Sequence, residues 1–321
     1  MSELAFLDLI RKDLERVEEL LQDKPPEQHE AIKVALDHLI GGGGKRLRPA
    51  LALLSTYLCG AEPDQAIYAA AAAEMLHTAT LIHDDLIDGS LLRRGVETLN
   101  ASWPPGATVL TGDYVFARAA HLITRANNIR LVQRFAETLM VICNGEVRQM
   151  FNGRDANSVR KEYEQRIFAK TASLIALAAE TGAILAQADE TLTNALRTYG
   201  ERLGLAFQVV DDVLDYVADE EILGKPVGSD LRQGLLTLPA LLFLEQEPEH
   251  PIFGQYLNQN PSDKLVAEAV QVVATSPAIQ RSLDIARDYA EQATDALAPF
   301  PASPYRAALC DLAEFTVSRH F

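Results

Sequence analysis

Two groups of aspartates share the spacing D-D-x-x-D. They are Asp84, Asp85 and Asp88 in LIHDDLID, and Asp211, Asp212 and Asp215 in QVVDDVLD. On a helix, positions i and i+4 share a face and i+1 lies beside it, so each motif presents a cluster of carboxylates. Like charges at that spacing repel and must be neutralised. A site with oxygen ligands and without histidine or cysteine favours Mg²⁺. This ion usually keeps several water ligands, and substrate phosphates complete its coordination sphere.

Apolar residues precede both motifs. Leu81 and Ile82 stand before the first motif, and Val209 and Val210 stand before the second. A single acidic motif is more often a solvated helix end, but two of them on apolar helices favour a metal site. We therefore expect both sets of carboxylates to line an internal cavity.

Basic residues follow a glycine run at residues 41–44 and also follow both aspartate motifs. Lys45 and Arg48 come after the glycines, and cations at this spacing on a permissive backbone suit a diphosphate. The segment is not a Walker A loop, because Arg46 takes the place of the required Ser or Thr. Taken alone, such a turn is more often simply solvated. The cations after the aspartate motifs are Arg93, Arg94 and Lys225.

The elements that must position these groups are helices, because apolar residues recur at three- and four-residue spacing through most of the chain. The expected helices span residues 7–21, 66–87, 112–124, 131–152, 160–187, 191–216, 264–275, 278–297 and 305–319. Residues 66–82 and 171–185 are apolar nearly all round and should lie inside. No convincing set of period-two strands is present. We predict an all-α fold, a large single-domain helical bundle over residues 1–321, because no Gly- or Pro-rich break is long enough for an interdomain linker.

The composition excludes some partners. The 321 residues include 29 Lys and Arg against 45 Asp and Glu, which gives a formal net charge of −16 and argues against nucleic acid as a ligand. Three widely spaced cysteines predict reduced thiols. The first twenty residues are charged where a secretory signal needs an apolar stretch, and no window reaches the roughly 18 apolar residues of a membrane span. We expect a cytoplasmic protein without a transmembrane segment.

Several ordered motifs together resemble those of the trans-type polyprenyl diphosphate synthases, or trans-prenyltransferases. The resemblance runs from about Gly41 to the C-terminus. Its motifs are GGKRLRP, HDDLIDGSLLRRG, GDY (112–114), GE-x-x-Q (145–149), KT (170–171), FQ-x-x-DD-x-x-D (207–215), GKP-x-G-x-DL (224–231) and TLP (237–239). The resemblance implies an all-α bundle around a central cavity, usually in a homodimer, with the two aspartate motifs facing each other across the cavity mouth.

The same resemblance implies an activity and a role for each site residue. The activity is the Mg²⁺-dependent, head-to-tail condensation of isopentenyl diphosphate with an allylic prenyl diphosphate. Mg²⁺, at about three ions per active site, would be held by Asp84, Asp88 and Asp211, with Asp85, Asp212 and Asp215 as nearby or water-mediated ligands. The allylic diphosphate would be bound by Arg93, Lys170 and Lys225. Isopentenyl diphosphate would be bound by Lys45, Arg48, His77 and Arg94.

His77 has a second interpretation, as a core histidine paired with a backbone group. Its position seven residues before Asp84, on the same helix face, favours a role toward an anion. The reaction also needs neutral polar groups that stabilise an allylic cation without attacking it, and Gln208 with the groups near Lys170 and Thr171 suit that task. We expect the departing diphosphate to take the proton, because no base stands out in the sequence.

Leu235 departs from the family pattern. Many members have a lysine at this position that contacts the allylic diphosphate, although some long-chain members also lack it. We expect this chain to depend more strongly on Mg²⁺, Lys170 and Lys225.

The length of the product should depend on the residues just before the first aspartate motif. The family limits chain growth there with bulky side chains, and this chain has Ala79 and Thr80. We therefore expect a long-chain all-trans product. A deeper floor could come from Leu76 or from residues 139–142, which could equally be core packing. A farnesyl or geranylgeranyl diphosphate synthase is the alternative.

Two further alternatives differ in kind. A class I terpene cyclase shares the first aspartate motif, but it would ordinarily carry an Asn/Ser/Glu-type second motif and would not need a second diphosphate site. A non-catalytic subunit of a heteromeric synthase would generally have lost aspartates, and all six remain here.

Overall fold

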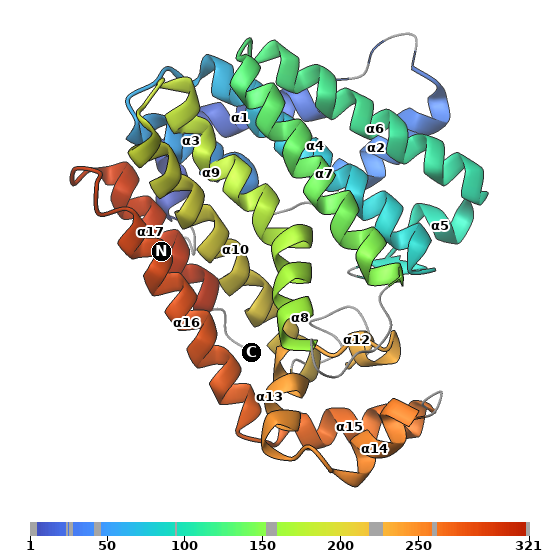
Figure 1. Cartoon of the computed structure of the whole chain (residues 1–321). Helices are drawn as coiled ribbons and strands as arrows, with labels where there is room; N and C mark the ends of the chain where they lie inside the picture. Colours follow the sequence, from blue (N-terminus) through green and yellow to red (C-terminus); the bar gives the residue numbers. More distant parts are fainter. Residues whose placement is uncertain are drawn as a thin grey trace.

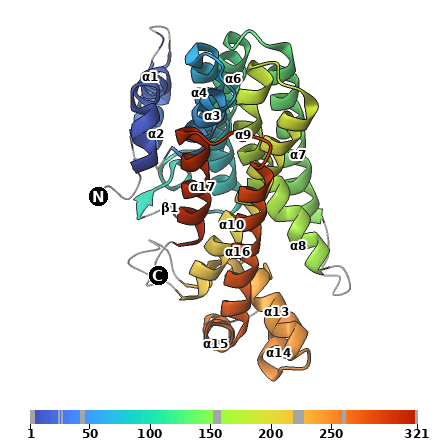
Figure 2. The same cartoon turned by 90° about the vertical axis from the view of Figure 1, so that its left-hand side faces the viewer.

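The computed structural model describes residues 5–23, 25, 28–41, 46–93, 95–151, 159–217, 227–258 and 262–318. Long helices run side by side and form a bundle, and α13, α14 and α15 extend from one end of it (Figures 1 and 2). The N-terminal half contains η1 (Ala5–Ile10), α1 (Arg11–Gln22), α2 (Glu30–Gly41), α3 (Leu47–Leu58), α4 (Pro63–Ile87), β1 (Leu92–Arg93), β2 (Val96–Glu97), α5 (Leu99–Ser102), α6 (Pro105–Arg125) and α7 (Ile129–Phe151). The C-terminal half contains α8 (Val159–Ile167), η2 (Phe168–Ala172), α9 (Ser173–Leu185), α10 (Glu190–Val217), α12 (Ser229–Arg232), α13 (Leu238–Gln246), α14 (Pro251–Asn258), α15 (Asp263–Ala274), α16 (Ala278–Ala296) and α17 (Pro304–Val317). The predicted all-α fold is confirmed, whereas the single-domain organisation stays a prediction.

The two segments predicted to lie inside are α4 and α9. Both helices are buried along most of their length, and α9 carries almost no exposed residue. Alanine and glycine allow this close packing, because a small side chain lets two helix backbones approach. A Cβ at Gly182 would lie 2.2 Å from the backbone of Ser55 in α3, and one at Gly204 would lie 2.5 Å from Ala172.

Glu180 of α9 is fully buried, and it is the charged residue within this apolar helix. Its carboxylate accepts hydrogen bonds from Nε of Arg134 in α7 and Nε of Arg197 in α10, each at 2.8 Å. A buried charge is costly unless it is paired, so these contacts hold α7, α9 and α10 in register.

One helical turn has an irregular hydrogen-bonding pattern. The five residues of η2, FAKTA, form a π-type turn between α8 and α9. Such turns are rare, and they often occur at functional sites because the extra residue redirects the side chains around it. The turn contains Lys170 and Thr171, two of the predicted site residues.

A short hairpin follows the first aspartate motif. Its strands β1 and β2 pair antiparallel, with Leu92 opposite Glu97, and Gly95 takes a left-handed conformation (φ 75°) in the turn. In the described part of the chain these are the only strands, in agreement with a sequence that showed no strand periodicity.

The stretch Arg160–Leu185 is long and apolar enough to cross a membrane by length and composition alone. However, 89% of its most apolar window is buried inside the protein. The expectation that no window is long and apolar enough for a membrane span is therefore corrected, but the burial of this stretch makes it a core element of the bundle.

Candidate active site

The first aspartate motif lies at the C-terminal end of α4. Asp85 is buried, and the guanidinium of Arg93 from β1 holds its carboxylate, with Nε at 2.9 and 3.1 Å from the two oxygens. An Nη atom of Arg93 lies 2.8 Å from the same group. Arg93 therefore already neutralises one carboxylate of the motif in the protein alone.

Lys170 of η2 connects the first motif to α7. Its Nζ lies 3.3 Å from Oδ2 of Asp84 and 3.3 Å from Oε1 of Glu146. Burial lowers the pKa of Lys170, but Asp84, Glu146 and Asp88 together raise it above the ordinary value, so the ammonium stays charged.

Negative charge exceeds positive charge around Lys170. Desolvation raises the pKa values of Asp88 and Glu146, and the neighbouring carboxylate of Asp84 raises them further, although Lys170 partly offsets both effects. Burial is the main cause of both shifts, and the added repulsion from Asp84 indicates that Lys170 alone does not balance these carboxylates. Asp84, Asp88 and Glu146 thus surround one ammonium with three carboxylates, and this surplus of negative charge suits a divalent ion that takes its other ligands from water and substrate phosphates.

The second aspartate motif lies near the C-terminal end of α10, and its three members differ in their surroundings. Asp211 is half-buried. Asp215 is buried and accepts hydrogen bonds from the hydroxyl of Ser229 at 2.8 Å and the backbone N–H of Asp230 at 3.1 Å. Asp215 thereby anchors the start of α12 to α10.

Asp212 is also buried, and it accepts two hydrogen bonds from side chains. The hydroxyl of Tyr163 in α8 donates to Oδ2 at 2.7 Å, and Nε2 of Gln208 donates to Oδ1 at 2.9 Å. Burial and the negative charge of Asp230 raise the pKa of Asp212 to about 7, against the lowering effect of these two donors.

Thr171 and Gln208, predicted as neutral polar groups of the site, lie in direct contact. The hydroxyl of Thr171 donates to Oε1 of Gln208 at 2.8 Å. Since Thr171 follows Lys170 on η2, the polar pair lies next to the cation that contacts the first motif.

The structure describes only some of the remaining cations that were predicted for the site. Arg48 at the start of α3 and His77 on α4 are both half-buried. Lys45, Arg94 and Lys225 lie outside the described residues. Arg46, next to Lys45, has a structural role, since its guanidinium donates to Glu18, to Glu74 (3.1 Å) and to the carbonyl of Ile40 (2.9 Å).

The two residues predicted to control product length differ in exposure. Ala79 is buried in the main apolar core, with 2% of its surface exposed. Thr80 is half-buried, and its hydroxyl donates to the carbonyl of His77 at 2.8 Å. Leu235, the departure from the family pattern, is half-buried in the connection between α12 and α13.

No three His, Cys, Asp or Glu side chains within the described ranges converge into a ready-made metal cluster. The oxygen donors come from different elements: Asp84 lies on α4, Asp88 directly follows α4, and Asp211 lies on α10. This arrangement fits Mg²⁺, which keeps several waters and takes its remaining ligands from substrate phosphates.

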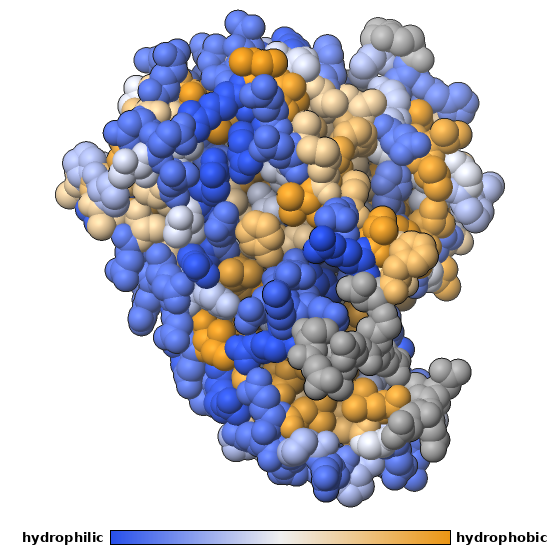
Figure 3. Space-filling view, in the orientation of Figure 1, coloured by the Kyte–Doolittle hydropathy of each residue, from blue (hydrophilic) through white to orange (hydrophobic). Residues whose placement is uncertain are grey.

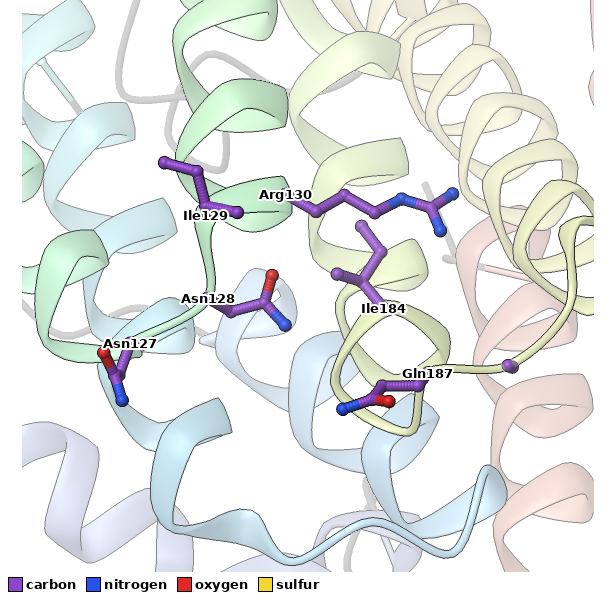
Figure 4. Close-up of a pocket in the computed structure, with 7 residues that line it drawn as sticks. Asn127, Asn128, Ile129, Arg130, Ile184 and Gln187 are labelled. Carbon is purple, nitrogen blue, oxygen red and sulfur yellow. The ribbon is translucent and has the colours of Figure 1, made fainter.

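A pocket of about 400 Å³ lies at the opposite end of the bundle (Figure 4). Its lining residues are Asn127, Asn128, Ile129, Arg130, Ile184, Gln187 and Ala188. At 1.5 Å per residue along α7, Ile129 is about 25 Å from Glu146, so this pocket is separate from the site.

Sequence reasoning missed four residues of the site. Glu146 was quoted only as part of the GE-x-x-Q motif, whose acidic residue beside a predicted helix was a usable signal. Asp230 was likewise quoted only as part of the GKP-x-G-x-DL motif. Tyr163 and Ser229 gave no such signal, because their contacts with the second motif depend on how α8 and α12 pack against α10.

Comparisons with known proteins point to one family. A family model described as polyprenyl synthetase matches residues 29–273. The chain is 35% identical over 286 residues to an octaprenyl diphosphate synthase of Haemophilus influenzae, covering 88% of this chain and 87% of that protein. It is 36% identical over 330 residues to a short chain isoprenyl diphosphate synthase of Methanothermobacter thermautotrophicus, covering 98% and 99%. A polyprenyl synthase from Caulobacter crescentus, complexed with calcium and isoprenyl diphosphate, matches with a TM-score of 0.92 at 40% identity, over 98% of this chain and 97% of that one.

Proposed function

Since this chain belongs to the polyprenyl synthetase family and is a prenyltransferase, we propose that it condenses isopentenyl diphosphate head to tail with an allylic prenyl diphosphate. The observation that carries this proposal is the position of Lys170. Its ammonium lies between Asp84 and Glu146, and the next residue contacts Gln208. Carboxylates, a cation and a neutral polar pair thus meet at one place, as the ionisation of an allylic diphosphate requires.

We propose Mg²⁺ as the metal and Asp84, Asp88 and Asp211 as its main ligands. The excess of carboxylates around Lys170 and the oxygen-only donor set support this assignment. When bound, Mg²⁺ supplies the positive charge that neutralises the diphosphate leaving group. The number of ions is proposed as three by the resemblance of the aspartate motifs alone.

Side chains of the protein bind the allylic diphosphate and stabilise the charges that develop during the reaction. Lys170 and Arg93 bind the allylic diphosphate and stabilise the charge that develops on it, with Lys225 as a further cation. As the bond from carbon to the diphosphate oxygen breaks, the Oε1 of Gln208 and the hydroxyl oxygen of Thr171 stabilise the allylic cation without attacking it. The alkene of isopentenyl diphosphate then forms the new carbon–carbon bond, and the released diphosphate takes the proton that is lost.

The second substrate needs its own cations. We propose that Arg48 and His77, together with Lys45 and Arg94, bind the diphosphate of isopentenyl diphosphate. The half-buried positions of Arg48 on α3 and His77 on α4 support this, because α3 and α4 pack against each other. A terpene cyclase would need no such second group of cations.

A long-chain product is the favoured outcome. Ala79 and Thr80 are small, so the helix before the first motif has no bulky side chain to stop a growing tail. The octaprenyl diphosphate synthase among the relatives supports this choice. The short chain relative keeps a shorter product as the second candidate.

A homodimer is supported by the exposed apolar side chains of α6 and α7. They are Val109, Leu110, Ile129, Met140, Val141, Val147, Met150 and Phe151. Figure 3 shows tan and orange surface along α7 on this face of the molecule. An apolar strip of this kind on a charged protein is typical of an interface.

The free cysteines support a cytoplasmic location, where thiols stay reduced.

The direct test replaces the proposed ligands one at a time. Asp84→Asn and Asp211→Asn should each lower incorporation of labelled isopentenyl diphosphate by at least about 100-fold, as expected for loss of charge stabilisation. Removal of Mg²⁺ with a chelator should abolish activity and added Mg²⁺ should restore it. Asp284→Asn, in an exposed pair with Arg287, is the matched control and should stay active. Full activity of both ligand variants would contradict the proposed site.

A further inference from the structure

Four side chains form a continuous hydrogen-bonded row beside the site. The hydroxyl of Tyr163 donates to Asp212, Nε2 of Gln208 donates to the other oxygen of Asp212, and the hydroxyl of Thr171 donates to Oε1 of Gln208. The three distances are 2.7, 2.9 and 2.8 Å. The row begins on α8, crosses α10 and ends on η2, beside Lys170.

The inner members of this row are buried. The exposed fractions of Tyr163 and Asp212 are 2% and 3%, and both carboxylate oxygens of Asp212 already accept a hydrogen bond from the protein. Asp211, its neighbour in the motif, is half-buried instead. Asp212 is therefore poorly placed to receive a hydrated ion, whereas Asp211 has access to one.

Asp212 determines which way the amide of Gln208 points. An amide side chain can turn over, because its oxygen and nitrogen have similar size. In the structure both oxygens of Asp212 accept hydrogen bonds, one from Tyr163 and one from Gln208, so the NH₂ group of Gln208 lies on the side of Asp212. The carbonyl oxygen of Gln208 is thereby directed at Thr171.

Tyr163 in turn fixes Asp212. A carboxylate with one donor could rotate about its Cβ–Cγ bond, but a second donor on the opposite oxygen holds it. The aromatic ring of Tyr163 is itself held by burial and by the guanidinium of Arg166, which lies 5.5 Å from the ring centroid. The packing of Tyr163 thus sets the orientation of Gln208 through Asp212.

We infer that Tyr163 and Asp212 are positioning residues, which hold the Gln208 carbonyl and the Thr171 hydroxyl against the allylic cation, and that Asp212 is not a metal ligand. This inference rests on the proposed function, because it gives a role in the same reaction. It differs from the role of water-mediated ligand that the family resemblance implies for Asp212. It also assigns a positioning role to Tyr163, which the sequence motifs did not include.

The test compares four variants with the wild type. Tyr163→Phe and Asp212→Asn remove one donor and one acceptor of the row, and Asp211→Asn removes a proposed metal ligand. Tyr199→Phe is the matched control, because the hydroxyl of this buried tyrosine on α10 donates to the Leu309 carbonyl at 2.8 Å, outside the row. Melting temperatures of all variants establish that they fold.

Two measurements separate positioning from metal binding. The first is kcat and KM for both substrates. The second is the dissociation constant of Mg²⁺ in the presence of inorganic diphosphate, measured by calorimetry without turnover. We expect Tyr163→Phe and Asp212→Asn to lower kcat by at least about tenfold, as for a lost catalytic hydrogen bond, with little change in KM. Their Mg²⁺ dissociation constants should stay within about threefold of wild type, while Asp211→Asn should weaken Mg²⁺ binding by about tenfold or more.

The double variant of Tyr163→Phe with Asp212→Asn provides a further criterion. If both residues act through Gln208, the double variant should be no more than about threefold slower than the slower single variant. The control Tyr199→Phe should lower the melting temperature about as much as Tyr163→Phe does, but its kcat should equal that of the wild type.

The possible contrary results distinguish failure of this inference from failure of the proposed function. If Asp212→Asn weakens Mg²⁺ binding as much as Asp211→Asn, or if Tyr163→Phe keeps its kcat, the inference is wrong and the proposed function stands. If the wild type itself transfers no prenyl group, the proposed function fails first.

Discussion

The ammonium of Lys170 lies 3.3 Å from Oε1 of Glu146 and 3.3 Å from Oδ2 of Asp84, so one cation joins a π-type turn to α7 and α4. The π-type turn places Lys170 where two helix ends and the Thr171–Gln208 pair meet. A diphosphate entering this site finds a charged lysine already in position, together with more carboxylates than this lysine alone can neutralise.

Replacing Lys170 by glutamine should weaken binding of the allylic substrate. A lost charge-assisted contact costs about 1.5–3 kcal/mol, so kcat/KM should fall by about 10- to 100-fold. Steady-state kinetics with varied allylic substrate measure this. Lys264→Gln is the control, because the Lys264 side chain is 87% exposed on α15. An unchanged kcat/KM for Lys170→Gln would remove this residue from the site.

The packing of α9 against α3 makes a stability prediction at Gly182. A Cβ there would lie 2.2 Å from the Ser55 backbone, which cannot move aside as a flexible side chain can. Gly182→Ala should therefore lower the free energy of unfolding by at least about 1–3 kcal/mol. Denaturant titration measures the change. Gly254→Ala, where an added Cβ meets nothing within 4 Å, should stay close to wild type. Equal stability of both variants would show that α3 and α9 are not so close.

A bulky side chain at Ala79 should shorten the product. Ala79→Phe places a ring just before the first aspartate motif, where a growing tail would have to pass. Thin-layer chromatography of the dephosphorylated products should show a shift to shorter chains. Ala267→Phe adds the same ring at an exposed position of α15 and should leave the product unchanged. An unaltered product from Ala79→Phe would overturn the proposed control of length.

Leu235 offers a test by gain of function. Leu235→Lys supplies the cation that many relatives have at this position, so KM for the allylic substrate should fall by about 3- to 10-fold. Leu235→Met, which changes shape without charge, should leave KM unaltered. If the lysine variant has the same KM as the wild type, the position does not face the allylic diphosphate.

Much of the fold could be predicted from the period of apolar residues. The long helices α4, α7, α10 and α16 lie within three residues of their expected ranges, whereas α6 begins at Pro105, seven residues before its expected start at residue 112. Six helices were not among the predicted ranges: α2, α3, α5, α12, α13 and α14. The helices α5 and α12 have only four residues each, and α3 and α13 are buried along most of their length, so their apolar residues show little periodicity. The π-type turn within the expected helix at residues 160–187 left no mark either, since its residues have ordinary helix-forming side chains.

The site was predictable where it depended on local spacing. The D-D-x-x-D motifs were identified from their spacing, whereas Lys170, Thr171 and Gln208 were implied by the family resemblance, and the structure brings Thr171 and Gln208 into contact. The contacts of Asp212 with Tyr163 and of Asp215 with Ser229 join different helices. Their geometry depends on helix packing, which local spacing does not contain.

The most direct measurement is a product assay on the purified chain alone. The protein is incubated with Mg²⁺, farnesyl diphosphate and labelled isopentenyl diphosphate, and the lengths of the products are read by reversed-phase chromatography. We expect that isopentenyl diphosphate is consumed and that a long-chain all-trans polyprenyl diphosphate accumulates. Failure of the folded chain to consume isopentenyl diphosphate, as for a cyclase or a subunit that needs a partner, would contradict this expectation.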